Sequence, residues 1–326
     1  MISILNELNY PYYNLAFEEY CLGHLPTDET YFILWQNSPA VIFGKNQDLF
    51  QEVDFRYARE HGIYLVRRIT GGGAVYHDLG NLNISIMGNF TKHPNYAEEY
   101  GEAVVRALQA IGLKGVEMNG RNDLYVDGKK VSGWAKRIQG DSFLFHGTLL
   151  YDVDLDQLER VLQIESGKMQ RKAVKSVKSV VQNIRELLPF QDISQLRTAL
   201  ERELRGQDRV WNLSSEEKSA IDKLVREKYE SEEWIYNLSF TPTHVHTTKA
   251  SCGTIIINLQ LAEDTISAIN FRGDFLGNKD TDSLCKVLRG VKRTKEAIRE
   301  RLAAISVGAY FSGLSNEDLV NMLCEE

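Results

Sequence analysis

The chain has 326 residues, of which 38 are basic and 45 acidic, so its formal net charge is −7. This negative balance argues against a general binder of DNA or RNA, because nucleic-acid phosphates attract a positively charged surface. Apolar residues make up 43% of the chain and charged residues 25%, a globular balance that excludes a disordered chain. No apolar run approaches the roughly 18 residues of a membrane helix, and the first residues lack a secretion signal. We therefore expect a cytoplasmic protein of about two domains that binds neither nucleic acid nor membrane.

Four cysteines, Cys21, Cys252, Cys285 and Cys324, are spread along the chain. None forms a CxxC pair, so their spacing indicates neither a zinc site nor a redox motif. Buried free thiols in a reducing compartment are the simplest interpretation. No thiol occurs between residues 22 and 251, which limits where a cysteine nucleophile could lie.

Strands and helices alternate in the first half of the sequence. Apolar, β-branched and aromatic runs predict strands at 31–36, 40–44, 63–69, 81–87, 123–126, 130–135 and 142–151. A short helix is predicted over 54–60. An amphipathic helix is predicted over 96–111, and a glycine follows it.

The rest of the chain divides into a helical stretch and a smaller unit. Residues 192–232 follow a helical pattern. The strand-like runs 253–261 and 265–271 flank a predicted hairpin turn, and three short helices with good N-cap residues follow. We place a boundary near residue 240, with a first domain of residues 1–240 and a small α+β domain of residues 241–326.

The densest polar segment runs from Arg67 to Asn83 and reads RRITGGGAVYHDLGNLN. Three consecutive glycines let the backbone pass close to a ligand and point several N–H groups at one anion. The preceding arginines supply forked donors that suit a carboxylate or a phosphate. The segment matches neither GxGxxG nor a P-loop, and a glycine triplet alone is most often a plain loop. The arginines, histidine and asparagines around it favour an anion-binding site.

A second candidate segment surrounds a predicted hairpin. Asp127 and Gly128 lie between two strand-like runs, and both central residues of such a turn need positive φ. Lys130 follows on a strand, where its ammonium could neutralise a phosphate, although a solvated lysine is the alternative. Its neighbour Lys129 faces the other side and is expected in solvent. His146 lies on an apolar strand, where histidine is usually a satisfied core residue.

A basic run extends from Lys168 to Lys178, with Arg171, Lys172 and Lys175 and no acidic residue. Such a run is usually a solvated face. In a chain that is negative overall, we interpret it as a local anion clamp rather than a nucleic-acid tract.

Together these motifs resemble the bidomain lipoate–protein ligase A family. The paired arginines, triple glycine and HDxGNxN pattern occur at 67–83, GRND and KVSG at 120–133, and HGTLL at 146–150. Residues 174–183 resemble the family's loop that closes over the adenylate, and 273–277 resemble part of its accessory domain. The resemblance extends nearly from end to end. It implies an α+β fold, with a mixed β-sheet catalytic domain of the biotin/lipoate ligase type flanked by helices, plus a small α+β accessory domain.

The resemblance implies an ATP-dependent ligase that acts in two steps. The lipoate carboxylate attacks the α-phosphate of ATP, which gives lipoyl-AMP and pyrophosphate. A lysine amine of a lipoyl domain or of glycine cleavage H protein then attacks the anhydride, leaving an amide and AMP. Arg68, Lys130 and Mg²⁺ would offset the repulsion between the two anions, and a closing loop would exclude water. We expect a monomer.

Residue by residue, the resemblance also implies the sites. ATP would be bound by Arg68, Gly73, Ala74, Val75, Tyr76 and Lys130. The lipoyl group would lie against Trp35, Gly71, Gly72, His77, Lys130 and His146. Lys130 would be catalytic, Asp123 would bind Mg²⁺ through a hard oxygen ligand, and the closing loop would include Lys172, Lys175 and Lys178. Trp134 stands where the family commonly has a small or polar residue, so we expect it to narrow or reroute the lipoyl channel.

Three other classes of protein stay open at this point. An octanoyl or lipoyl transferase of the same superfamily works through an acyl-cysteine, and Cys21 is the only candidate thiol of the first domain. A biotin ligase shares the fold but has a different glycine–arginine motif. A non-catalytic lipoyl-binding protein would not need Lys130.

Overall fold

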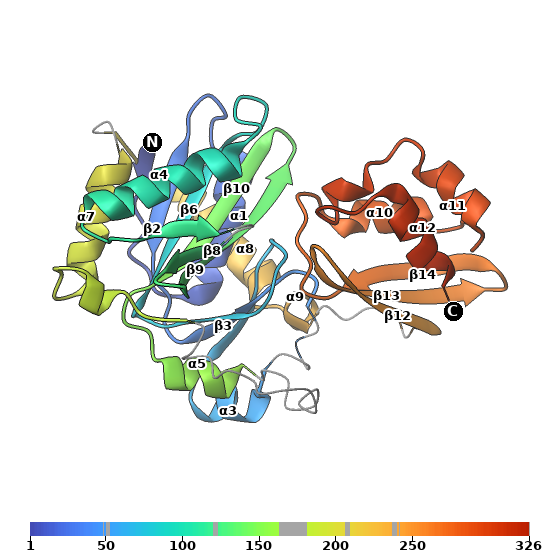
Figure 1. The fold of residues 1–326 in the computed structure, drawn as a ribbon, viewed down its shortest axis with the longest axis horizontal. Helices are drawn as coiled ribbons and strands as arrows, with labels where there is room; N and C mark the ends of the chain where they lie inside the picture. Colours follow the sequence, from blue (N-terminus) through green and yellow to red (C-terminus); the bar gives the residue numbers. More distant parts are fainter. Residues whose placement is uncertain are drawn as a thin grey trace.

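The computed structural model of the chain describes residues 1–47, 49, 53–119, 123–162, 181–205, 209–236, 240 and 242–325. The larger part contains two β-sheets with helices around them, and the C-terminal part contains a third sheet covered by helices (Figure 1). Within these ranges, no helix has the length and apolar character needed to span a lipid bilayer.

Eight of the described strands form a mixed main sheet. In spatial order they are β11 (Val210–Trp211), β1 (Ile2–Ile4), β2 (Tyr31–Trp35), β6 (Asn81–Asn89), β10 (Ser142–Leu150), β9 (Lys129–Gln139), β8 (Asp123–Val126) and β7 (Glu117–Asn119). β1 pairs in parallel with β2 and β11, and the other neighbours are antiparallel. β8 and β9 form the predicted hairpin, with Asp127 and Gly128 at positive φ.

Helices cover both faces of the main sheet. One face packs against α4 (Tyr96–Ala110) and α7 (Ile193–Arg205), the other against α1 (Pro11–His24) and α8 (Ser215–Leu224). Because side chains alternate along a strand, Phe32 of β2 lies in the first core and Ile33 in the second. The main sheet is thus a rigid partition between two apolar cores.

A three-stranded sheet carries the glycine-rich segment. Its order is β4 (Tyr64–Arg67), β3 (Ala40–Phe43) and β5 (Val75–His77), with α3 (Phe55–Glu60), α5 (Leu155–Val161) and α9 (Glu232–Tyr236) nearby. The chain leaves β4, forms the triple-glycine loop and returns as β5 on the far side of β3. The loop therefore crosses over the end of β3.

The C-terminal part is an antiparallel sheet backed by helices. Its strands are β12 (His244–Ala250), β13 (Gly253–Ala262) and β14 (Thr265–Arg272), and its helices are α10 (Thr281–Leu288), α11 (Lys295–Leu302) and α12 (Asn316–Cys324). Their apolar side chains form one core, in which Phe271 and Phe311 make an edge contact. This agrees with the predicted hairpin and three helices.

Most predicted elements are present, and the predicted α+β fold class is confirmed. Residues 192–232 differ from the prediction: β11 separates α7 from α8 because Val210 and Trp211 pair with β1, and a π-helical turn follows at Val225–Tyr229. Short 3₁₀ turns occur at Arg185–Leu187 and Val307–Ala309. Helix α1 has no counterpart among the predicted elements.

Candidate active site

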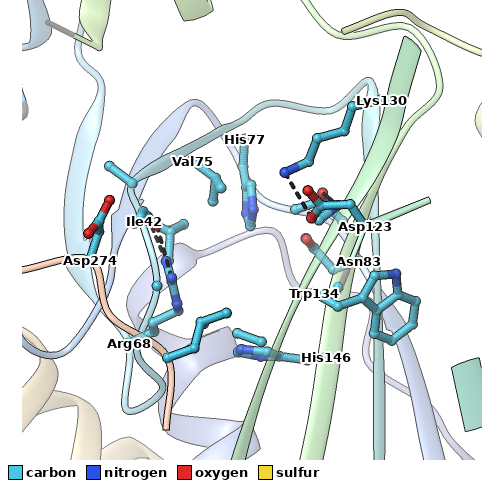
Figure 2. Close-up of a pocket in the computed structure, with 18 of the residues that line it drawn as sticks. Ile42, Arg68, Val75, His77, Asn83, Asp123, Lys130, Trp134, His146 and Asp274 are labelled. Atoms are coloured by element: carbon cyan, nitrogen blue, oxygen red, sulfur yellow. Dashed lines mark hydrogen bonds and ion pairs between the residues drawn. The ribbon is translucent and has the colours of Figure 1, made fainter. Parts of the chain in front are cut away.

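A cavity of about 330 Å³ lies between the glycine loop, the main sheet and the C-terminal part, within the usual size range of ligand pockets. Its lining includes ten residues that the sequence indicated: Trp35, Arg68, Gly72, Gly73, Ala74, Val75, His77, Asp123, Lys130 and His146. Figure 2 shows Arg68, His77, Lys130 and His146 around this space. Segments far apart in the sequence therefore meet at one site.

The glycine loop can cross β3 only where side chains are absent. A Cβ at Gly44, directly after β3, would lie 2.1 Å from the carbonyl oxygen of Gly72. Gly72 itself has a φ of 92°, a conformation that favours glycine. A Cβ at Gly73 would meet no heavy atom within 4 Å, so this glycine borders open space.

Gly71 faces the C-terminal part and does not line the cavity. A Cβ on Gly71 would lie 2.7 Å from the carbonyl oxygen of Phe275. The amide of Gly72 donates to the same oxygen at 3.2 Å. The expected contact of Gly71 with the lipoyl group stays a prediction. In this structure Gly71 is where the C-terminal part packs on the loop.

The two arginines before the loop have different surroundings. Arg67 is fully buried and donates to the main-chain oxygens of Gly44, Lys45, Gln47, Trp234 and Ile235. Arg68 donates from Nε to Thr70 Oγ1 at 2.9 Å and from its terminal nitrogens to the carbonyls of Ile42, Gly71 and Gly73. Arg68 therefore holds the loop in shape from the cavity side. Burial lowers the pKa of Arg68 to about 10, against the opposing effect of Glu18, so the guanidinium stays charged at neutral pH.

Lys130 of β9 extends into the cavity and pairs with Asp123, with Nζ 2.9 Å from Oδ1 (Figure 2). Both side chains are about one-third exposed, at 36% and 31%. A Cβ at Gly133 would lie 3.0 Å from the same Nζ, so the glycine of KVSG leaves room for the lysine. Lys129 is exposed, as predicted. Because both groups are accessible, the ammonium of Lys130 can release Asp123 and pair with a bound anion instead.

The cavity contains two buried histidines with different partners. Burial, together with the nearby Arg68 guanidinium and His146 ring, lowers the pKa of His77 to about 3, so the His77 ring is neutral. Its Nδ1 lies 3.1 Å from Asn37 Nδ2, and its Nε2 has no partner among the described residues. His146 bridges Glu18 and Thr70, with 2.8 Å from Nδ1 to Oε1 and 2.8 Å from Nε2 to Oγ1. Neither histidine is an apolar core residue.

Of the remaining predicted residues, Tyr76 does not line the cavity and Trp134 does. The side chain of Tyr76 is buried in the core beside α3 and α5, and its hydroxyl donates to Gln157. The ring of Trp134 stacks on Phe145 at 4.4 Å, and a Cβ at Gly147 would lie 2.3 Å from that ring. Trp134 therefore packs against the core that contains α4 and also borders the cavity, and the expectation that it narrows or reroutes the lipoyl channel stays a prediction. Lys172, Lys175 and Lys178 lie outside the described residues.

Several lining residues were not among the predicted site residues. Asn83 lines the cavity from β6, and Cys252, Asp274 and Leu276 line it from the C-terminal part. Asn83 has a detectable signal, since asparagine or serine recurs at every second position of an otherwise apolar strand, at 81, 83 and 85. The three C-terminal residues have no such signal, because only the packing of the two parts brings them here.

Few side chains near Lys130 could bind a metal ion. Among the residues that the structure describes, no three histidine, cysteine, aspartate or glutamate side chains gather in one place. Asp123 contributes a single accessible carboxylate. This fits Mg²⁺, which commonly takes one or two carboxylates and completes its shell with substrate phosphates and water.

The mixed sheet and the glycine loop over β3 form an α+β domain with the fold of the biotin/lipoate ligase type, followed by a smaller C-terminal unit. Residues 10–205 match the family model of the lipoyl protein ligase A/B catalytic domain. Residues 239–323 match the model of the bacterial lipoate protein ligase C-terminus. The chain therefore belongs to the lipoate–protein ligase family.

Relatives of the whole chain support this membership. The lipoate-protein ligase LplJ of Bacillus subtilis is 33% identical over 334 residues, covering 99% of this chain and 100% of that protein. Lipoate–protein ligase 1 of Staphylococcus aureus is 34% identical over 326 residues, covering 98% of each.

Solved structures show the same fold. LipL1 of P. falciparum, in complex with lipoate, has a TM-score of 0.81 at 20% identity and covers 100% of this chain and 99% of its own. The lipoate protein ligase of Thermoplasma acidophilum was solved in work on a bi-partite ligase and its E2 lipoyl domain (TM-score 0.65, 30% identity, 74% of this chain and 98% of that chain). It was also solved with lipoic acid (TM-score 0.62, 29% identity, 73% and 100%). A lipoate-protein ligase A bound with ATP has a TM-score of 0.62 at 28% identity, covering 73% and 99%.

Proposed function

We propose that the protein is an ATP-dependent lipoate–protein ligase that activates lipoate as lipoyl-AMP and transfers the lipoyl group to a lysine of an acceptor protein. The observation that carries this proposal is one cavity in which Lys130, the glycine loop supported by Arg68 and two buried histidines meet. The relatives named as lipoate–protein ligases support the activity. The solved relatives that hold lipoic acid or ATP support the two substrates.

In the first step, a carboxylate oxygen of lipoate attacks the α-phosphorus of ATP, and pyrophosphate leaves with the electron pair of the broken P–O bond. Both reactants are anions, so the ammonium of Lys130 offsets their repulsion once it exchanges Asp123 for them. We assign the phosphates to the segment from Gly73 to Tyr76 and to Arg68. The lipoyl chain lies against Trp35, Gly71, Gly72, His77 and His146.

Asp123 is the residue that would hold Mg²⁺ beside the phosphates. When bound, the ion supplies positive charge to the triphosphate. If Asp123 held the ion, the ammonium of Lys130 would be free to face the reacting oxygens. The exposed Asp123–Lys130 pair makes this exchange accessible.

In the second step, the amine of an acceptor lysine attacks the acyl carbon of lipoyl-AMP, and AMP leaves with the electron pair of the acyl–oxygen bond. Lipoyl domains of 2-oxoacid dehydrogenase acyltransferases and glycine cleavage H protein are the proposed acceptors, and the work on the Thermoplasma ligase with its E2 lipoyl domain supports the first of these. We also propose that the protein is a cytoplasmic monomer that divides at residue 240, and that the basic run with Lys172, Lys175 and Lys178 covers the adenylate.

Release of pyrophosphate from ATP and lipoate alone, without any acceptor protein, tests this proposal. A ligase releases it, and the released amount rises with added lipoate. A thiol transferase or a non-catalytic lipoyl-binding protein releases none, so a folded protein without this activity would contradict the proposal.

The structure disfavours the acyl-cysteine route through Cys21. Cys21 belongs to α1, and its side chain is 1% exposed in the core that α1 shares with the main sheet and does not line the cavity. Burial and the nearby carboxylates Glu18 and Glu217 raise the pKa of the Cys21 thiol far above its ordinary value. A thiol held in its neutral form is a poor nucleophile.

A further inference from the structure

We propose that helix α1 fixes the hydrogen positions of both cavity histidines, through Asn14 and Glu18, and that these two are positioning residues of the lipoyl site. They are four positions apart and lie on one side of the helix. Each is 1% exposed, and neither lines the cavity. Asn14 and Glu18 can therefore affect a ligand only through the side chains to which they are hydrogen-bonded, including Asn37 and His146.

The Asn14 branch starts from unambiguous acceptors. Asn14 Nδ2 donates to the main-chain oxygens of Leu8 at 2.9 Å and Gln36 at 2.8 Å. These contacts fix which end of the Asn14 amide carries hydrogen. The Asn37 atom 2.8 Å from the same nitrogen is therefore its acceptor Oδ1, because that nitrogen cannot accept and shares its two hydrogens among the three oxygens. The other end of Asn37, Nδ2, then donates to His77 Nδ1 at 3.1 Å. Because the His77 ring is neutral, its single N–H lies on Nε2.

The Glu18 branch gives the opposite tautomer. The Glu18 carboxylate can only accept, so His146 Nδ1, 2.8 Å away, carries hydrogen. On the other side of the ring, Thr70 Oγ1 already accepts from Arg68 Nε at 2.9 Å. We infer that the Thr70 hydroxyl donates its own hydrogen to His146 Nε2, which lies 2.8 Å away. This chain of hydrogen bonds connects α1 to the arginine that holds the loop.

The two tautomers have different consequences for a ligand. His77 presents an N–H at Nε2, and that nitrogen has no partner among the described residues. It is a donor for an acyl oxygen, whereas the other tautomer would turn a lone pair toward a carboxylate. His146 presents no N–H to the loop, and its ring completes the support of Arg68. The assignment of the acyl oxygen to lipoate rests on the proposed function.

The tautomers can be read directly from the ¹⁵N-labelled protein without substrate, by two-bond nitrogen–proton correlations of the imidazole rings. The expected result is hydrogen on Nε2 of His77 and on Nδ1 of His146. The reverse pattern in either ring would overturn the proposal. This readout does not depend on activity, so a protein that released no pyrophosphate would refute the proposed function and leave the tautomers testable.

Asn37→Asp is the variant that reverses one branch. The new carboxylate still accepts from Asn14 but must also accept from His77, which moves the His77 hydrogen to Nδ1. We expect the KM for lipoate to rise about tenfold, the effect of one lost hydrogen bond to a buried group, with the KM for ATP unchanged. Asn9→Asp is the matched control, because it introduces the same negative charge at an exposed position near Asn37. The two positions are neighbours through Ser38, whose amide donates to the Asn9 carbonyl at 2.8 Å. An unchanged KM for lipoate in a variant whose His77 hydrogen has moved would refute the positioning role.

Discussion

The two walls of the cavity are built in different ways. In the larger part, Arg68 and His146 belong to buried hydrogen-bond chains that end in a helix and a sheet. The C-terminal wall, formed by Cys252, Asp274 and Leu276, is joined to the larger part at a few points. These include main-chain hydrogen bonds from Gly72 to Phe275, Gly273 to Asn46, and Ile138 to Asn278. We infer from this difference that the first wall carries the proposed chemistry and that the second wall encloses it.

Charge reinforces the junction between the walls. Asp280, at the start of α10, accepts from Lys45 and, at 3.2 Å, from Arg137. These side chains are 13–23% exposed, so water screens them only in part. The C-terminal wall is therefore held by contacts that single substitutions can weaken without disturbing either core.

The largest expected effect is on the first wall, at Lys130. Lys130→Ala removes the ammonium that offsets the two anions, and we expect pyrophosphate release to fall about 10²–10³-fold with the fold retained. The rate of release with ATP and lipoate measures this. Lys129→Ala is the matched control, because Lys129 is the neighbouring lysine and its side chain is exposed to solvent. Normal release by a folded Lys130→Ala protein would contradict the assignment.

The next largest effect is expected from a substitution that weakens the contact between the two walls. Gly71→Ala places a Cβ 2.7 Å from the carbonyl oxygen of Phe275, and main chain cannot yield as a flexible side chain does. We expect faster hydrogen exchange at the Gly72 amide and about a tenfold slower pyrophosphate release, since the cavity loses its enclosure. Gly73→Ala, which meets nothing within 4 Å, should leave the Gly72 amide protected. Full protection in Gly71→Ala would show that the contact is unimportant.

A smaller effect is expected from the charge at the junction. Burial alone would raise the pKa of Asp280, but Lys45 and Arg137 lower it below its ordinary value. Because the pKa of Asp280 is lowered when the two parts are joined, the ionised carboxylate stabilises the junction at pH values above the ordinary aspartate pKa of about 3.9. This stabilisation is lost as the pH falls through the lowered pKa. Asp280→Asn keeps a good N-cap residue and should weaken the attachment by about 1 kcal/mol at neutral pH.

The ratio of Gly72 exchange rates between Asp280→Asn and the parent protein tests this. The ratio should stay constant above about pH 5 and approach one only as the pH falls below the lowered pKa of Asp280, where both side chains are neutral. A ratio that does not change with pH would show that the ionised carboxylate adds nothing to the attachment.

The sequence predicted the reactive wall well because its residues are close together along the chain. Arg68 to His77 form the glycine loop and β5, and Lys130 follows a turn whose two residues have positive φ. Helix α1 was missed because it is buried on several sides and therefore lacks a one-sided apolar pattern. Glu18 was missed with it. The residues of the C-terminal wall could not be predicted for another reason, because no local sequence pattern encodes which surfaces of two domains meet.

The smallest expected effect concerns Cys252, the thiol that the C-terminal wall brings to the cavity. An acyl-enzyme route would need this sulfur as its nucleophile, whereas attack of a carboxylate on ATP and of an amine on the anhydride needs no thiol. Cys252→Ser keeps the shape of a side chain that is 4% exposed, so we expect pyrophosphate release and lipoyl transfer to stay within about twofold of the parent. Both rates should be measured, because a transferase would lose the second and never show the first. Loss of transfer in the folded serine variant would move the chemistry to the wall that we assign to enclosure.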